Sequence, residues 1–399
     1  MGGVVDGIQR MITANRDLGA RITEARGWRG ELAAIHGDSR HPSGFSKHFV
    51  DWCVQSGLAD ADFLKAGRAG FGGFTEYRGY SPRPAIVLVH GNGCDATVMA
   101  PTITELMRQG FGPQDIYVVS YGKGDPEQAA NETHAPAYAR NLRTFLDAVA
   151  GYTGRQLVVV GHSKGVTDVQ LAIHGVSIDE GGDVVRFANK LPVRTFIGAA
   201  GANQGLSECR TLPFLPVSNR YNGFHPEAKL YQVLPKLGKA ADRVFSMVAR
   251  DDELEDDELK TAQVPFQDGQ VVLGSGGHMA PIWEPDALAS LIADRRYDLI
   301  ARDAYESIRP GLKYANPLSP FALADAMLVA GEHFLGAGFE AARLRDPAMR
   351  AGCGIATLFE AARAAFLQMP QVPMALLASA GVRTPEAAAI AGEISRRAR

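Results

Sequence analysis

The sequence predicts an α/β protein whose core is a mostly parallel, doubly wound β-sheet. Three observations lead to this prediction. Short β-branched runs recur from residue 85 onward, stretches with apolar residues at helical spacing separate them, and the runs are hydrophobic almost throughout instead of alternating. Strands that helices cover on both faces show this continuous pattern, because neither face meets water.

Six runs are predicted to form strands of this sheet. In chain order they are AIVLVH (85–90), DIYVVSY (115–121), QLVVVGH (156–162), VRTFIGAA (193–200), RVFSMVA (243–249) and QVVLGSG (270–276). Apolar residues at helical spacing predict helices over 96–110, 134–152 and 164–175. Gly110, Gly151 and Gly175 stand where these helices are expected to end.

The chain is predicted to have three parts. Residues 1–80 form a lead-in segment, residues 81–300 the sheet domain, and residues 301–399 an alanine-rich helical region. About forty residues, 202–242, separate two predicted strands, and so long a connection is typical of a lid or a substrate-binding insertion. Helix starts in the last region are expected at Ser319–Pro320, Asp346–Pro347 and Thr384–Pro385. These helices are expected to pack on the sheet domain or to form a homo-oligomer.

Composition excludes several classes of partner. With 41 basic and 44 acidic residues, a net charge of −3 and no long basic run, the chain lacks the charge pattern of a protein that binds nucleic acid or an anionic membrane. No apolar stretch reaches the length of a membrane span, and the N-terminus lacks a secretory signal, so we expect a cytoplasmic protein. Four scattered cysteines without a CxxC pair predict neither a disulfide scaffold nor a cysteine metal site.

Ser163 is the candidate nucleophile. It lies in GHSKG, where a predicted buried strand meets a predicted helix, and a sharp turn there would expose its hydroxyl above the sheet. Gly161 and Gly165 would let the strand and helix approach closely. The competing interpretation is an ordinary glycine-flanked turn.

A serine nucleophile needs a base that an acid orients, and both are expected after later strands. His278 follows a strand and a glycine turn, and a helix is expected to start near Pro285. Asp252 is the preferred acid because it follows a strand directly, and Asp251 is the alternative. Residues 253 and 256–258 are interpreted as a solvated charge run.

Two backbone amides are the candidate donors to an oxyanion. Asn92, in the HGNG segment after the first predicted strand, should provide one, and Lys164, directly after Ser163, the other. Taken alone, HGNG also fits a tight turn or a phosphate-binding loop, although it lacks the GxGxxG and Walker spacings.

Together these motifs resemble the α/β-hydrolase superfamily. VHGNG, RTFLDAVAGYTGRQLVVVGHSKG, FIGAAGANQGL and GGHMAP are most similar to the lipase-like poly(3-hydroxybutyrate) depolymerases and the class 2 bacterial lipases, over roughly residues 84–280. The resemblance implies an α/β-hydrolase fold and a triad of Ser163, Asp252 and His278. It also implies an oxyanion hole at Asn92 and Lys164, and neither a metal nor an organic cofactor.

The expected activity is hydrolysis of carboxylic esters, either polyhydroxyalkanoates such as polyhydroxybutyrate or short to medium-chain acyl esters. Aromatic residues of the 202–242 insertion are predicted to line the substrate pocket: Phe214, Tyr221, Phe224 and Tyr231. The Lys164 ammonium has two interpretations, attraction of a substrate carboxylate or pairing with Asp168 one helical turn on. Alternative functions are an acyltransferase, lactonase or amidase with the same triad, and a non-catalytic binding module.

Overall fold

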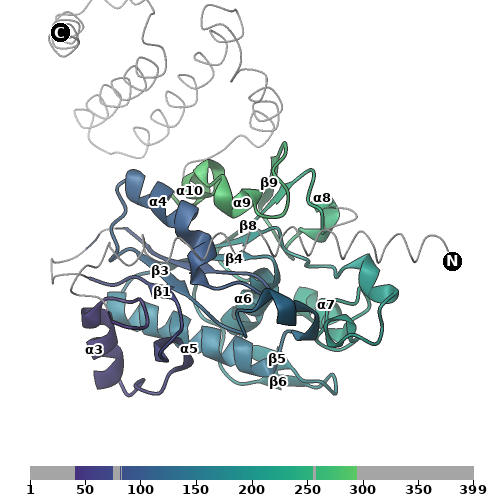
Figure 1. The fold of residues 1–399 in the computed structure, drawn as a ribbon, viewed down its shortest axis with the longest axis horizontal. Coiled ribbons are helices and arrows are strands. Elements are labelled where there is room, and N and C mark those ends of the chain that lie inside the picture. Colours follow the sequence, from purple (N-terminus) through teal and green to yellow (C-terminus); the bar gives the residue numbers. More distant parts are fainter. Residues whose placement is uncertain (1–40, 75–80, 82, 255–257, 294–399) are drawn as a thin grey trace, which may run out of the picture. The chain divides into compact units, whose positions relative to one another are not determined.

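The computed structural model describes residues 41–74, 81, 83–254 and 258–293 of the 399-residue chain. In this part a seven-stranded sheet has the order β1-β3-β2-β4-β7-β8-β9. Figure 1 labels β1, β3, β4, β8 and β9 of this sheet. Neighbouring strands are parallel throughout, except that β1 pairs antiparallel with β3 at one edge. The predicted mostly parallel α/β fold is therefore confirmed.

All six predicted strands are present. They are β2 (Ala85–Val89), β3 (Ile116–Val119), β4 (Leu157–His162), β7 (Thr195–Ala199), β8 (Arg243–Ala249) and β9 (Gly269–Leu273). The structure adds β1 (Gly70–Phe71) and a separate antiparallel pair, β5 (Val176–Ile178) and β6 (Val184–Arg186). These three strands are too short to show the periodicity that identified the others.

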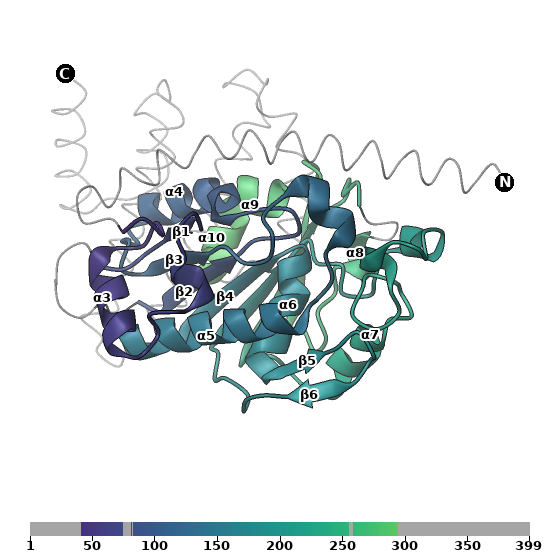
Figure 2. The same ribbon diagram turned by 60° about the horizontal axis from the view of Figure 1, so that its bottom comes forward.

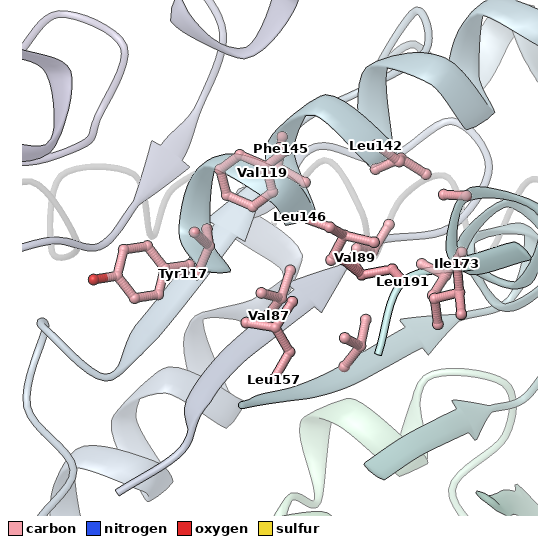
Figure 3. Packing of buried hydrophobic residues seen from close by; sticks show 14 of the residues in the cluster. Val87, Val89, Tyr117, Val119, Leu142, Phe145, Leu146, Leu157, Ile173 and Leu191 are labelled. Carbon is pink, nitrogen blue, oxygen red and sulfur yellow. The ribbon is translucent and has the colours of Figure 1, made fainter. Parts of the chain in front are cut away.

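Helices cover both faces of the sheet (Figure 2). On one face lie α4 (Ala100–Arg108), α9 (Ala280–Trp283) and α10 (Asp286–Ile292), and on the other α3 (Lys47–Gln55), α5 (Pro136–Thr153) and α6 (Lys164–His174). Along β2, Ile86 and Leu88 pack on the first face. Val87 and Val89 pack on the second, as Figure 3 shows. Both faces of the strand are thus buried, which explains its unbroken hydrophobic run.

Residues 41–74 belong to the sheet domain. Phe45, Phe49 and Phe63 pack against Phe145 of α5, and β1 extends the sheet. The boundary predicted at residue 80 therefore falls inside the domain, because contacts between distant segments leave no local sequence signal. The predictions for residues 1–40, 75–80 and 301–399 lie outside the described residues.

The predicted insertion, residues 202–242, follows β7 and contains α7 (Lys229–Val233) and three short 3₁₀ turns. Asn203 anchors its start. The backbone N–H of Asn203 donates to Thr261 O at 2.9 Å, and its side-chain Nδ2 donates to Ala262 O at 3.0 Å. Thr261 ends α8 (Glu258–Thr261), so this bond attaches the insertion to the connection between β8 and β9. None of the helices described has the length and hydropathy needed to cross a membrane.

Two of the three glycines predicted to end helices do so. Gly110 and Gly175 follow α4 and α6 with φ of 86° and 66°. Gly151 instead lies inside α5, which ends at Gly154 with φ 62°. A Cβ at Gly151 would lie 3.0 Å from Cη2 of Trp52, so this glycine provides room for the packing of α3 on α5.

The two helix-ending glycines at 154 and 175 allow a paired test of how closely the surrounding atoms pack against each of them. A Cβ at Gly154 would meet no atom within 4 Å, whereas one at Gly175 would lie 2.2 Å from the carbonyl oxygen of Ala188. We expect Gly154→Ala to lower the unfolding free energy by about 1 kcal/mol, the usual cost of a left-handed L-residue. Gly175→Ala should lower it clearly more, because the backbone at Ala188 must also move. Urea unfolding measures both losses, and equal losses would contradict the expected crowding.

Three histidines that end structural elements are buried. His90 directly follows β2, His162 ends β4 and His174 ends α6. Burial disfavours the charged imidazolium and lowers the pKa of His90 to about 4, of His162 to about 3 and of His174 to about 4. All three are therefore neutral at physiological pH.

This predicts that lowering the pH destabilises the fold already at pH values well above those at which carboxylates titrate. Between the unfolded-state pKa near 6.5 and the lowered folded values, the unfolded chain binds more protons, so stability falls as pH falls. From about pH 7.5 to about pH 5, each histidine should cost roughly 2 kcal/mol of unfolding free energy. His174→Gln removes one of the three and should reduce the pH dependence accordingly. Urea unfolding across this range checks it, and an unchanged pH slope in the variant would contradict the assignment.

Candidate active site

Ser163 occupies a strained turn between β4 and α6. Its backbone angles are φ 53° and ψ −128°, a region that L-residues seldom adopt. The turn is tight, since a Cβ at Gly161 would lie 2.7 Å from Gly165 O and one at Gly165 only 2.4 Å from His90 O. The predicted sharp turn with small flanking residues is therefore present, and Ser163 lies at the positive end of α6.

Asp252 and His278 form a buried hydrogen-bonded pair. The imidazole Nδ1 lies 2.9 and 3.0 Å from the two carboxylate oxygens. Because a carboxylate only accepts, Nδ1 carries the proton, and Nε2 of the neutral ring keeps its lone pair. Burial by itself would raise the pKa of Asp252, but the electrostatic interaction and hydrogen bond with His278 outweigh it and lower that pKa below its ordinary value. Asp252 is thus an anion at neutral pH.

The acids on either side of Asp252 bind the backbone of residues 276–278, which we call the histidine loop. Asp251 accepts from the amides of the two residues before His278, at 3.0 and 2.9 Å. Glu253 accepts from the backbone N–H of His278 at 2.7 Å. Of the two alternative acids, Asp252 contacts the imidazole. Glu253 is exposed, as expected of the solvated charge run, but it also bonds the backbone of the loop that follows β9, a contact that the sequence did not indicate.

His162 connects the loop that carries His278 to the Ser163 turn. Its Nε2 lies 3.0 Å from the carbonyl oxygen of His278, and the two imidazole rings are 5.0 Å apart. Since His162 directly precedes Ser163, this bond brings the residue-278 backbone beside the β4–α6 turn. The sequence prediction missed this role, and the only signal for it was the position of His162 inside the G-x-S-x-G motif.

The two predicted oxyanion donors flank Ser163. Gly91, which precedes Asn92, approaches so closely that a Cβ there would lie 2.6 Å from the Ser163 Cβ. Lys164 is the first residue of α6, where a backbone N–H has no partner within the helix. Among the described residues, neither the Asn92 nor the Lys164 backbone N–H has a hydrogen-bond acceptor. Both amides are therefore available to an oxyanion.

The Lys164 side chain faces into the protein. Only 1% of it is exposed, its Nζ donates to Asp168 Oδ2 at 2.6 Å, and it lies 4.4 Å from the ring centroid of Tyr138. Of the two interpretations of the Lys164 ammonium, pairing with Asp168 is thus confirmed. A buried, paired ammonium offers no charge to a substrate carboxylate.

The four aromatic residues predicted to line a substrate pocket do not share one cavity. A groove of about 930 Å³ lies between the insertion and residues 260–267, and of the four only Tyr231 lines it. Phe224 is buried against His134, whereas Phe214 and Tyr221 are 76% and 46% exposed. The prediction grouped them by the composition of one segment, which does not determine where each side chain points.

Comparison with known proteins identifies the family. The model of the family described as lipase (class 2) matches residues 83–285, just over half of the chain. The search of curated proteins found no match.

The solved structures similar to this chain include lipases and an esterase. The propeptide form of the Bacillus licheniformis lipase BlEst2 is 15% identical, with a TM-score of 0.41 over 56% of this chain and 53% of that one. Aspergillus fumigatus lipase B is also 15% identical, with a TM-score of 0.40 over 56% of this chain and 57% of that one. This chain thus spans little more than half the length of either. An esterase from Exiguobacterium antarcticum is 11% identical, with a TM-score of 0.35 over 54% of this chain and 92% of that one.

The matched family segment contains the Ser163 turn, the Asp252–His278 pair and both candidate oxyanion amides. Its parallel sheet, with helices on both faces, is that of an α/β-hydrolase. The chain therefore belongs to the class 2 lipase family and has the α/β-hydrolase fold.

Proposed function

We propose that this protein is a carboxylic ester hydrolase that forms an acyl-enzyme on Ser163. The observation that carries the proposal is the buried Asp252–His278 pair, whose loop is hydrogen-bonded to His162, the residue before the strained Ser163 turn. A hydroxyl needs such an oriented base to become a nucleophile. Membership of a lipase family supports cleavage of carboxylic esters.

In the proposed reaction, Ser163 Oγ attacks the ester carbonyl carbon while Nε2 of His278 takes the hydroxyl proton. Asp252 stabilises the imidazolium, and the backbone N–H groups of Asn92 and Lys164 donate to the oxyanion. The ester C–O bond then breaks, and Nε2 returns the proton to the leaving alcohol. Water, deprotonated by His278, hydrolyses the acyl-enzyme, releasing the acid and restoring Ser163.

We propose neutral acyl esters as the substrates, either polyhydroxyalkanoates such as polyhydroxybutyrate or short to medium-chain esters. The buried pairing of Lys164 with Asp168 supports a neutral acyl group, because the cation next to the nucleophile is already neutralised. We assign the insertion, residues 202–242, the role of shaping the acyl pocket. Rates on p-nitrophenyl esters of graded chain length, with a polyhydroxybutyrate suspension alongside, distinguish these substrates. Preference for esters that carry a free carboxylate would contradict this assignment.

Ser163→Ala should abolish turnover of p-nitrophenyl esters, because it removes the hydroxyl that is proposed to form the acyl-enzyme. The loss should be at least about 10⁴-fold in kcat. The alanine leaves the buried core untouched, so the urea midpoint should stay close to that of the wild type. A fluorophosphonate probe should label the wild type at Ser163 and leave the variant unlabelled. Undiminished turnover in the variant would refute the proposed function.

Adjacent aspartates provide a matched test of the acid. Asp252→Asn removes the charge that faces the imidazole and should lower kcat by about 10⁴-fold, as expected for the acid of a serine triad. Asp251→Asn keeps an oxygen that can accept from the loop amides, so its kcat should stay within about tenfold of the wild type. Steady-state kinetics on one ester compares them. Equal losses, or a larger loss for Asp251→Asn, would reject Asp252 as the acid.

A further inference from the structure

A buried chain of hydrogen bonds links the two amides of the proposed oxyanion hole. We call Lys164, Asp168, Tyr121 and His90 the Asp168 network. The Asp168 carboxylate is fully buried on α6 and accepts from Lys164 Nζ at 2.6 Å, Tyr121 Oη at 2.9 Å and His134 Nδ1 at 2.9 Å. Burial would raise the pKa of Asp168, but Lys164 and His134 outweigh it and lower this pKa to about 2. The centre of the network is therefore an anion.

One arm of the network runs from Asp168 through Tyr121 to His90. The backbone N–H of Tyr121 donates to Nε2 of His90 at 3.2 Å, and the two rings are 4.8 Å apart. On its other side, Nδ1 of His90 lies 2.8 Å from the carbonyl oxygen of Gly91. A carbonyl only accepts and Nε2 is itself accepting, so the neutral tautomer with a proton on Nδ1 satisfies both contacts.

This arm sets the direction of the Asn92 amide. In a planar trans peptide, the carbonyl oxygen of Gly91 and the N–H of Asn92 point in opposite directions. By holding Gly91 O toward its own ring, His90 turns the Asn92 N–H away from itself. Since Gly91 lies against the Cβ of Ser163, a small rotation of this peptide would move the donor relative to the nucleophile.

The other arm fixes the first turn of α6. The Lys164 ammonium is held by Asp168 one helical turn on, and it lies 4.4 and 5.0 Å from the ring centroids of Tyr138 and Tyr121. The same residue carries the second proposed oxyanion donor on its backbone. Its side chain thus anchors the residue whose N–H starts the helix.

We propose that Asp168 is the positioning residue of the oxyanion hole, holding the Lys164 amide through the lysine side chain and the Asn92 amide through Tyr121 and His90. This inference rests on the proposed function. Each oxyanion donor is effective only within a few tenths of an ångström of its place, so a shared anchor keeps both aligned. A purely stabilising role explains the network poorly, since apolar residues often replace buried ion pairs without loss of stability.

The first test compares two hydroxyls that contact the same cluster. Tyr121→Phe removes the bond to Asp168 and keeps the lysine–carboxylate pair, so the variant should fold. Tyr138→Phe removes a hydroxyl that bonds Glu132 at 3.2 Å and does not contact Asp168. It keeps the ring over the Lys164 ammonium, which also lies 4.0 Å from Glu132 Oε2, and is the matched control. We expect Tyr121→Phe to lower kcat about tenfold, with KM within about twofold, and Tyr138→Phe to change kcat by less than about twofold. Fluorophosphonate titration corrects each rate for the active fraction.

The second test distinguishes the contributions of the two ring nitrogens of His90 to kcat. In His90→Asn the amide nitrogen can take the place of Nδ1 and still donate to Gly91 O, whereas His90→Gln reproduces only the Nε2 end. We expect kcat to fall about 100-fold in His90→Gln and to remain within about tenfold of the wild type in His90→Asn. An alkyl boronic acid, whose adduct with Ser163 resembles the tetrahedral intermediate, should bind more weakly in proportion to the lost kcat/KM.

Three outcomes would overturn the inference: equal kcat values for the two tyrosine variants, wild-type kcat in His90→Gln, or unchanged boronic acid binding in the impaired variants. A failure of the proposed function looks different. In that case Ser163→Ala would be as active as the wild type, or the folded wild type would resist fluorophosphonate labelling.

Discussion

The close approach of α6 to β4 and β2 is the constraint on which the candidate site depends. All eleven residues of this helix are buried, and no side chain larger than hydrogen fits at Gly161 or Gly165, where the helix contacts the strands. This packing forces Ser163 into its strained turn and places the first amide of α6 beside it. The same contact brings the β2 backbone at His90 against the helix, so Ser163 and both candidate oxyanion amides share one packing interface.

The parallel sheet accounts for the rest of the convergence. Residues that follow β2, β4, β8 and β9 come together because the carboxyl ends of parallel strands lie at one edge. At that edge three consecutive acids contact different parts of the histidine loop. Asp252 binds the ring of His278, while Asp251 and Glu253 bind backbone amides of the loop. The imidazole is thus held through its backbone as well as through its side chain.

Two histidines buried beside Ser163, His90 and His162, are kept neutral by their surroundings. The pKa of His90 and of His162 is lowered by burial, and each donates one ring proton to a carbonyl oxygen, Gly91 O and His278 O respectively. A neutral ring with one donor suits a carbonyl partner better than an imidazolium does in a dry interior. The tautomers are therefore set by the backbone that surrounds them.

Much of this protein could be predicted from the sequence, because the strongest signals are local. Continuous β-branched runs identified all six long strands, and the GHSKG segment identified the turn at Ser163. What remained open depended on contacts between distant segments. Tertiary structure alone decided that Asp252 faces His278, that Lys164 is buried, that residues 41–74 belong to the sheet domain and that the four aromatic residues do not share a cavity. Strand and turn propensity act over a few neighbouring residues, whereas the direction of a side chain is set by whatever the fold packs against it.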